Sequence, residues 1–220
     1  MAAGALKQFL FIFCVLAAND LAYGYVPKEL LLSVYYESKC PDSRDFVLNQ
    51  LMPTMKMLPN NIILQLVPFG KAKSIEQGYR GFECQHGPSE CLGNIIQSCA
   101  LNLMRSKTDL KKAEYVACEM KSLASTRGDL TCVQQANLDP EMVNQCIESG
   151  EGAELQLDAE FLTGLISPKF IPTVTIDGIF NQQIQDHSQI DLTGTLCSIL
   201  KETKQCAQHY NNMALKYVLV

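Results

Sequence analysis

The first half of the chain alternates between apolar runs and one segment with helical spacing. ELLLSVYYES (29–38) and NIILQLVPFG (61–70) are short runs rich in strand formers, which is typical of buried strands. Between them, apolar residues recur at helical spacing, at Val47, Leu51, Met55 and Leu58. Pro53 lies inside this pattern and predicts a kink or an early end of the helix. The order strand, helix, strand predicts a βαβ unit with parallel strands.

The middle region, at about 71–168, has helical patterns and no strong strand pattern. The predicted helices span about 89–104, 108–124, 139–149 and 153–166. In the third of these, Asp139 is placed as the N-cap, Pro140 as the first helical residue and Gly150 as the stop. This region also contains most of the cysteines of the chain. We therefore expect a helical insert stabilised by disulfides, since short helices bury little apolar surface.

The last third returns to strands and ends in a helix. KFIPTVTIDGIF (169–180) predicts two strands, with Asp-Gly at 177–178 as a hairpin turn. A closing helix over about 187–204 has one face formed by Ile190, Thr193, Leu196, Cys197 and Leu200. The whole order is β-α-β, helical insert, β-β-α. It predicts an α/β fold with a thioredoxin-like core and a disulfide-rich helical insertion.

The N-terminus has the three parts of a secretory signal peptide. Lys7 gives the positive region, FLFIFCVLAA (9–18) is the apolar run, and AYG (22–24) has small residues where a signal peptidase cleaves. A buried N-terminal helix is the alternative interpretation. The run is too short to span a bilayer, which needs ~20 residues, and no later segment is long enough without charges. We expect cleavage of residues 1–24, leaving one domain, Tyr25–Val220, in an oxidising compartment without a membrane span.

Charge and cysteine content narrow the class of protein. The net charge of −5, without a basic run, gives no reason to expect nucleic acid as a partner. Of ten cysteines, Cys14 leaves with the signal peptide. The nine that remain are Cys40, Cys84, Cys91, Cys99, Cys118, Cys132, Cys146, Cys197 and Cys206. Because nine is odd, one cysteine is either a free reactive thiol or part of an intermolecular bridge, and the sequence leaves the pairing open.

Cys40 is the candidate for the free thiol. In KCPDS (39–43) it stands between the first predicted strand and the following helix, where unpaired backbone N–H groups stabilise a thiolate. Pro41 suits the first helical position, whereas the negative charge of Asp42 opposes thiolate formation. The alternative is that Cys40 pairs with another cysteine. As a thiolate it would be the nucleophile of a disulfide exchange.

Pro172, in FIPTV (170–174), directly precedes a predicted strand. Such a proline either starts an edge strand or forms a cis peptide in a tight turn. In thioredoxin-like folds a cis-proline loop lies beside the nucleophile and binds the substrate backbone. Pro172 fits that place in the order of elements.

CQHGPSECLGNIIQSC (84–99) is the most specific motif of the chain. It matches the pattern C-Q-H-G-x-x-E-C-x-x-N-x-x-x-x-C at Cys84, Gln85, His86, Gly87, Glu90, Cys91, Asn94 and Cys99. The chain therefore resembles the gamma-interferon-inducible lysosomal thiol reductase (GILT) family. YYESKCPDS, QLMP and IPTVTIDG follow the family's order, so the resemblance covers about residues 29–206. It implies a thioredoxin-like core and reduction of protein disulfides in acidic or extracellular spaces.

The resemblance places Cys40 on the family's nucleophile and Ser43 on its resolving cysteine. Ser43 cannot form the internal disulfide that releases a substrate, although its hydroxyl can donate a hydrogen bond to a Cys40 thiolate. A mixed disulfide at Cys40 would therefore await an external thiol such as glutathione or free cysteine. We expect catalysis through Cys40 and Ser43, with Pro172 in substrate binding.

The other cysteines are expected to be structural. The predicted disulfide cysteines, of unknown pairing, are Cys84, Cys91, Cys99, Cys118, Cys132, Cys146, Cys197 and Cys206. His86 is interpreted as a hydrogen-bonded polar residue near them. A zinc site formed by Cys84, His86, Cys91 and Cys99 is the alternative, disfavoured in an oxidising compartment. His187 and His209 have no nucleophile or ligand cluster near them in sequence.

Two functions follow as hypotheses. The first is a thiol–disulfide oxidoreductase that uses one cysteine, needs no cofactor besides an external thiol, and acts on disulfide-containing proteins. The second is a secreted binding protein on the same scaffold, active in host defence or at a host or microbial surface. The mature chain lacks an Asn-x-Ser/Thr sequon, so secretion is expected and a lysosomal or endosomal location is the alternative.

Overall fold

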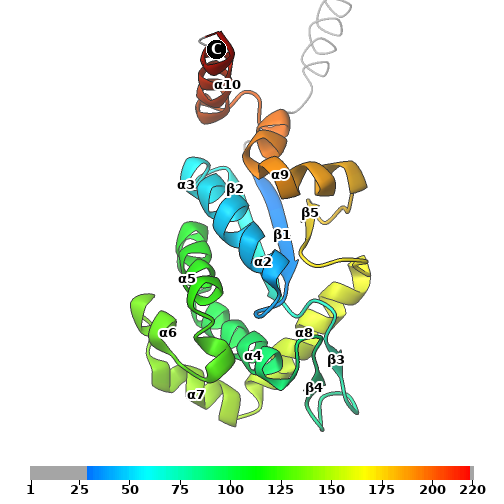
Figure 1. The fold of residues 1–220 in the computed structure, drawn as a ribbon. Coiled ribbons are helices and arrows are strands. Elements are labelled where there is room, and N and C mark those ends of the chain that lie inside the picture. Colours follow the sequence, from blue (N-terminus) through cyan, green and yellow to red (C-terminus); the bar gives the residue numbers. More distant parts are fainter. Residues whose placement is uncertain (1–28, 219–220) are drawn as a thin grey trace, which may run out of the picture.

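The structure, a computed structural model, describes residues 29–218 and contains one three-stranded sheet. The predicted signal peptide lies outside these residues. The strands are β1 (Leu30–Tyr36), β2 (Ile62–Pro68) and β5 (Thr173–Ile176), in the order β2-β1-β5. β1 pairs parallel with β2 and antiparallel with β5. The sequence prediction of a βαβ unit is confirmed (Figure 1). No helix of the described part of the chain is long and apolar enough to cross a membrane.

One continuous helical segment connects β1 to β2. It consists of α2 (Pro41–Phe46), a π-helical turn η1 (Val47–Leu51) and α3 (Met52–Met57). Of the two expectations for Pro53, a kink or an early end, the early end is wrong, since the helix continues to Met57. The irregularity is the π turn just before Pro53, where the Met52 N–H donates to the Val47 carbonyl. This wider turn accommodates a residue that lacks an N–H and crowds the preceding turn.

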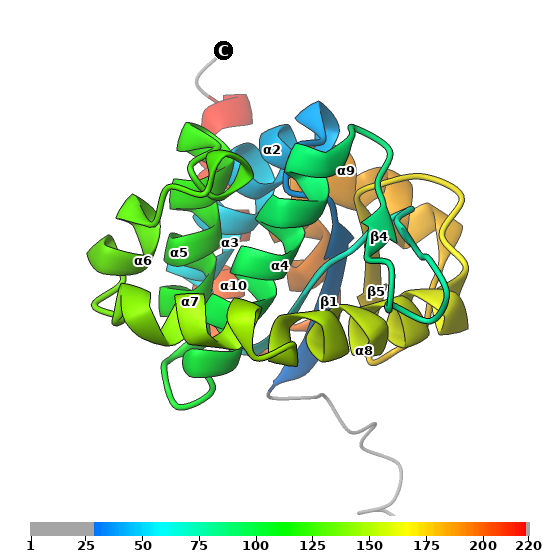
Figure 2. The ribbon, with the colours of Figure 1, turned by 90° about the horizontal axis from the view of Figure 1, so that it is seen from below.

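The insert between β2 and β5 is mainly helical, as predicted. Its elements are β3 (Lys73–Ser74), β4 (Phe82–Glu83), α4 (Pro88–Leu103), α5 (Asp109–Ser122), η2 (Ser125–Arg127), α6 (Thr131–Gln135), α7 (Pro140–Glu148) and α8 (Glu151–Ile166). The four predicted helices are α4, α5, α7 and α8, and Asp139 caps α7 by accepting the Glu141 N–H. The small β3–β4 ribbon and α6 were not predicted, because both are too short for a periodic pattern. Figure 2 shows α4 and α8 side by side in front of the sheet.

The C-terminal region differs from the prediction in its second strand. After β5 the backbone turns at Asp177 and Gly178, both at positive φ, and a single bridge joins Ile176 to Ile179. Asn181 then caps the next helix by accepting the Ile184 N–H. Only two residues remain between turn and cap, so the predicted β-β hairpin is reduced to one strand and a bridge.

The predicted closing helix is two helices, α9 (Gln182–Ile199) and α10 (Lys204–Val218). Within α9 the backbone of Asp191 is not helical, and its carboxylate accepts the Gly194 N–H as a new cap. This break changes which face of the helix points inward. The expectation that Ile190 shares one face with Leu196 and Cys197 is therefore wrong: Ile190 is exposed, whereas Leu196 and Cys197 are buried.

Within residues 29–218, four disulfides hold the helices together, and they use all eight cysteines that were expected to be structural. The pairs are Cys84–Cys91, Cys99–Cys146, Cys118–Cys132 and Cys197–Cys206. They connect the start of α4 to its preceding loop, α4 to α7, α5 to α6, and α9 to α10. A disulfide of this kind contributes about 2–4 kcal/mol by restricting the unfolded chain. The alternative zinc site is wrong, because its three cysteines are oxidised in two separate disulfides.

Candidate active site

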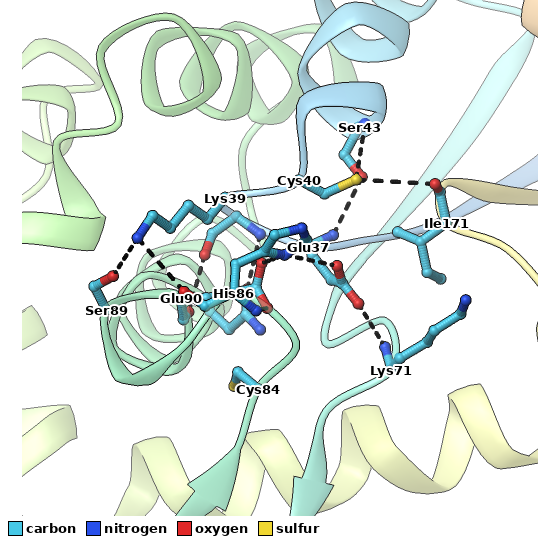
Figure 3. A network of polar contacts seen from close by, with 12 residues as sticks. Glu37, Lys39, Cys40, Ser43, Lys71, Cys84, His86, Ser89, Glu90 and Ile171 are labelled. Atoms are coloured by element: carbon cyan, nitrogen blue, oxygen red, sulfur yellow. Dashed lines mark hydrogen bonds and ion pairs between the residues drawn. The ribbon is translucent and has the colours of Figure 1, made fainter.

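Cys40 lies at the corner where β1 ends and α2 begins, with its sulfur facing the loop before β5 (Figure 3). Its backbone is extended, and its sulfur accepts a hydrogen bond from the Ser43 N–H at 3.5 Å. The sulfur is 3.9 Å from the carbonyl oxygen of Ile171. Cys40 is 7% exposed and, within residues 29–218, is the cysteine that forms no disulfide. The thiol is therefore held between a helix start and a neighbouring loop.

Ser43 is fully buried one turn into the helix. Its hydroxyl oxygen accepts the Glu37 N–H at 3.4 Å, while its backbone N–H serves the Cys40 sulfur. The sequence allows a hydrogen bond from the Ser43 hydroxyl to the sulfur. In the structure the main-chain N–H of Ser43 makes this contact, and the hydroxyl accepts the Glu37 N–H at the strand–helix corner.

The loop opposite the sulfur is fixed by Gln185 of α9. The Ile171–Pro172 peptide bond is cis, one of the two alternatives for Pro172. The Gln185 amide donates to the Pro172 carbonyl at 3.0 Å and accepts the Val174 N–H at 2.8 Å. The structure thus brings Cys40, Ser43 and the Pro172 loop together.

A pocket of about 420 Å³ adjoins this loop, between α2 and α9. Phe170 and Pro172 form one side of it. Asp42, Asp45 and Asp186 also line it, and no lysine or arginine of residues 29–218 does. A segment bound here would meet an apolar wall and negative charge.

Residues of the 84–99 motif support the backbone that leads to Cys40. The Asn94 side chain accepts the Ser38 N–H at 2.9 Å, and the Ser38 hydroxyl donates to the Glu90 carbonyl at 2.9 Å. Gly93 allows this approach, since a Cβ there would lie 2.5 Å from the Ser38 hydroxyl oxygen. The motif therefore acts as a support for the turn between β1 and α2.

Beneath that turn, His86 lies between two buried carboxylates (Figure 3). Its Nδ1 is 2.5 Å from Glu90 and 3.3 Å from Glu37. Burial raises the pKa of Glu37, and a hydrogen bond from the Lys71 N–H partly offsets this. His86 is hydrogen-bonded, as expected, and its partners are the carboxylates of Glu90 and Glu37. Sequence reasoning missed Glu37, although a glutamate at the end of an apolar strand was a visible signal.

The other two histidines lie apart from this site. His187 is exposed on α9, and His209 lies on α10 beside the ring of Tyr210. Neither has a described contact with Cys40 or with the 84–99 motif.

The comparisons with known proteins agree with this geometry. A family model described as gamma interferon inducible lysosomal thiol reductase (GILT) matches residues 31–149, more than half of the chain. The chain belongs to the GILT family. A GILT-like protein of Anopheles gambiae is 34% identical over 191 residues, which are 80% of this chain and 79% of that protein. The GILT protein of Carassius auratus is 32% identical over 181 residues, 80% of this chain and 70% of that protein.

Solved structures of two bacterial proteins share the fold of this GILT protein. BdbD from Bacillus subtilis superimposes with a TM-score of 0.52 at 11% identity, over 81% of this chain and 91% of that chain. The oxidoreductase DsbA from Xylella fastidiosa superimposes with a TM-score of 0.50 at 10% identity, over 82% of this chain and 90% of that chain. At these identities the likeness is one of fold, and it confirms the thioredoxin-like class with a helical insert.

Proposed function

We propose that this GILT protein is a thiol–disulfide oxidoreductase that works through Cys40 alone. The observation that carries the proposal is the free thiol at the start of α2, while the other eight cysteines of the described chain are paired. The family and the fold support disulfide exchange, since relatives named as thiol reductases are 28–34% identical to it. Because Ser43 stands at the position of the family's resolving cysteine, an internal thiol cannot resolve the mixed disulfide there.

The proposed reaction begins with attack of the Cys40 thiolate on one sulfur of a substrate disulfide. A mixed disulfide forms between Cys40 and the substrate, and the other substrate sulfur leaves as a thiolate. An external thiolate such as glutathione then attacks the Cys40 sulfur and releases the second substrate thiol. A second glutathione frees Cys40 and forms glutathione disulfide. Two electrons pass from two glutathiones to the substrate, so the protein needs no prosthetic group.

The site residues have distinct roles in this scheme. The Ser43 N–H stabilises the sulfur as its negative charge develops, at the position where it already donates. The main chain next to Pro172 lies across from Cys40 and offers hydrogen-bonding groups to an extended substrate segment. The substrates would be proteins with accessible disulfides, met outside the cell after secretion or in an endosome or lysosome.

The test is disulfide reduction by the mature chain with excess glutathione, from pH 4.5 to 7.5. Cys40→Ala is the inactive control, and Ser43→Cys recreates a two-cysteine site. We expect turnover that requires Cys40 and rises with glutathione concentration. In Ser43→Cys the rate of substrate release should depend less on the glutathione concentration, because the new cysteine can itself resolve the mixed disulfide. Equal turnover in wild type and Cys40→Ala would contradict the proposal.

A second candidate is a secreted binding protein on the same scaffold. The small exposure of Cys40 and the buried hydroxyl of Ser43 favour it, because neither suits rapid two-thiol exchange. This hypothesis expects a host or microbial surface partner whose binding persists in Cys40→Ala. Binding would be lost after reduction of the four disulfides that shape the surface.

A further inference from the structure

Glu37, His86 and Glu90 form a cluster in which three ligand-type atoms converge on one point. The His86 Nδ1 faces Oε2 of both carboxylates, and one ligand atom of each of the three residues lies within 4.8 Å of the others. An imidazole Nδ1 carries at most one hydrogen. It cannot satisfy two carboxylate oxygens at hydrogen-bonding distance, and Glu37 Oε2 is buried without a hydrogen bond. Among residues 29–218, no donor completes the hydrogen bonding of Glu37 Oε2.

The outer oxygens of both carboxylates are already fixed by main-chain donors. The Lys71 N–H donates to Glu37 Oε1 at 2.8 Å, and the His86 N–H donates to Glu90 Oε1 at 3.1 Å. Each glutamate therefore presents its second oxygen to the same centre. Orientation of ligating carboxylates by such outer hydrogen bonds is a regular feature of metal sites.

The backbone leaves room for this arrangement. A Cβ on Gly70 would lie 2.2 Å from Glu37 Cγ, so the chain passes directly against the Glu37 side chain. Glu37 and Glu90 are fully buried, whereas the His86 side chain is 31% exposed. Two sides of the centre are closed and one is open to solvent, which leaves a path for a small ligand and a position for water.

Charge balance identifies the class of ligand. Two ionised carboxylates would bring two negative charges into this centre, and such charges are costly to bury unless they are compensated. The lysines nearby do not enter the centre: Lys39 contacts Ser89 and the His86 carbonyl, and the Lys71 side chain is exposed. A divalent cation would make the site neutral.

We propose that Glu37, His86 and Glu90 form a binding site for a divalent cation of the zinc type, with water as a fourth ligand. Imidazole nitrogen with carboxylate oxygen is a ligand set that zinc accepts, whereas magnesium and calcium prefer oxygen alone. Tetrahedral zinc places its ligand atoms roughly 3.3 Å apart. The Nδ1–Glu37 separation of 3.3 Å already fits this, and the 2.5 Å contact with Glu90 must lengthen as the ion replaces the proton.

The test uses the disulfide-intact mature chain, depleted of metal and titrated with Zn²⁺ at pH 7 by calorimetry, with bound metal counted by mass spectrometry. We expect one equivalent of zinc. The affinity should fall at least about tenfold in Glu37→Gln and in His86→Ala, because each removes a ligand. His187→Ala is the matched control for an exposed histidine, and Cys40→Ala is the control for the free thiol. Neither control should change the affinity.

Nitrogen-15 spectra of the histidines in the wild type test the proposal without requiring that any variant folds. Zinc should shift the His86 Nδ1 resonance in step with the calorimetric titration and leave His187 and His209 unchanged. Absence of stoichiometric binding would overturn the proposal. So would binding that survives both ligand substitutions, binding lost in Cys40→Ala, or a titration that leaves the His86 resonance in place.

Discussion

Asn94 accepts the backbone N–H of Ser38 at 2.9 Å, and through this bond an insert helix holds the turn that presents Cys40. Both residues are fully buried, so water cannot replace either partner. The sequence separation of 56 residues makes this a tertiary contact between the core and the insert. It gives the asparagine of the 84–99 motif a specific structural role.

Replacing Asn94 by alanine should leave the Ser38 N–H buried without an acceptor. The expected loss in the free energy of unfolding is about 1–3 kcal/mol. Chemical denaturation of wild type and variant measures it. Asn144→Ala, at an exposed position of α7, is the control and should change stability by less than about 0.5 kcal/mol. Equal effects of the two substitutions would show that the Asn94 contact contributes little.

Gly93 and Gly164 provide a matched pair within two helices. A Cβ at Gly93 would lie 2.5 Å from the Ser38 hydroxyl oxygen and 2.9 Å from a Thr126 methyl group, whereas a Cβ at Gly164 meets nothing within 4 Å. Gly93→Ala should destabilise the protein by about 1–3 kcal/mol through overpacking. Gly164→Ala should be neutral or stabilise it by up to about 1 kcal/mol. The midpoint temperatures of thermal unfolding of the two variants should shift in opposite directions from the wild type, or differ from each other by several degrees.

The acidic pocket beside Pro172 predicts a preference for cationic substrate segments. Disulfide peptides with lysine or arginine near the cysteine should react faster than acidic ones, and salt should reduce the difference. The double substitution Asp45→Asn with Asp186→Asn should remove most of the rate difference between cationic and acidic peptides. Asp158→Asn, an exposed carboxylate on α8, should not. A preference that is unchanged in the double variant would place the selectivity elsewhere.

The burial of Glu119 predicts that the free energy of unfolding depends on pH for a reason unrelated to the active site. It is fully buried, and burial raises its pKa, while the hydrogen bond from the Ser125 N–H at 2.9 Å partly offsets this. The folded state therefore binds more protons than the unfolded state above pH 4.5. This contribution is complete below the unfolded pKa and is lost as the pH rises through the folded pKa.

The measurement is the free energy of unfolding between pH 4 and 7 for wild type and Glu119→Gln. The difference between the two should change with pH, with the wild type losing stability relative to the variant as the pH rises. A difference that is constant across this range would contradict the burial argument for Glu119.

The sequence was sufficient for the βαβ unit, the main insert helices and the order of elements around Cys40. These depend on local patterns: an apolar run, a change to helical spacing, and caps such as Asp139. The second strand after β5 and the place of Ile190 on the predicted helix face were wrong, because Asn181 and Asp191 start new helical segments through their own side chains. Capping at these positions overrides the hydrophobic pattern.

The contacts around Glu37 could not be predicted in the same way. Glu37 lies near the end of the apolar run 29–38, and the pattern of that run does not indicate its partners. Its burial depends on His86 and Lys71, which arrive from segments 49 and 34 residues away. The role of Ser43 was only partly predictable for a similar reason: its hydroxyl accepts the Glu37 N–H, and this contact forms only in the folded strand–helix corner.

The central claim is that Cys40 is the single exchanging thiol, and a mixed disulfide tests it most directly. The mature chain is incubated with glutathione disulfide at pH 7 and analysed, without reduction, by intact and peptide mass spectrometry. We predict one glutathione per chain, attached to Cys40 and removed by excess thiol, with the four structural disulfides unchanged. The absence of an adduct on Cys40, or an adduct on one of the eight paired cysteines, would contradict the account.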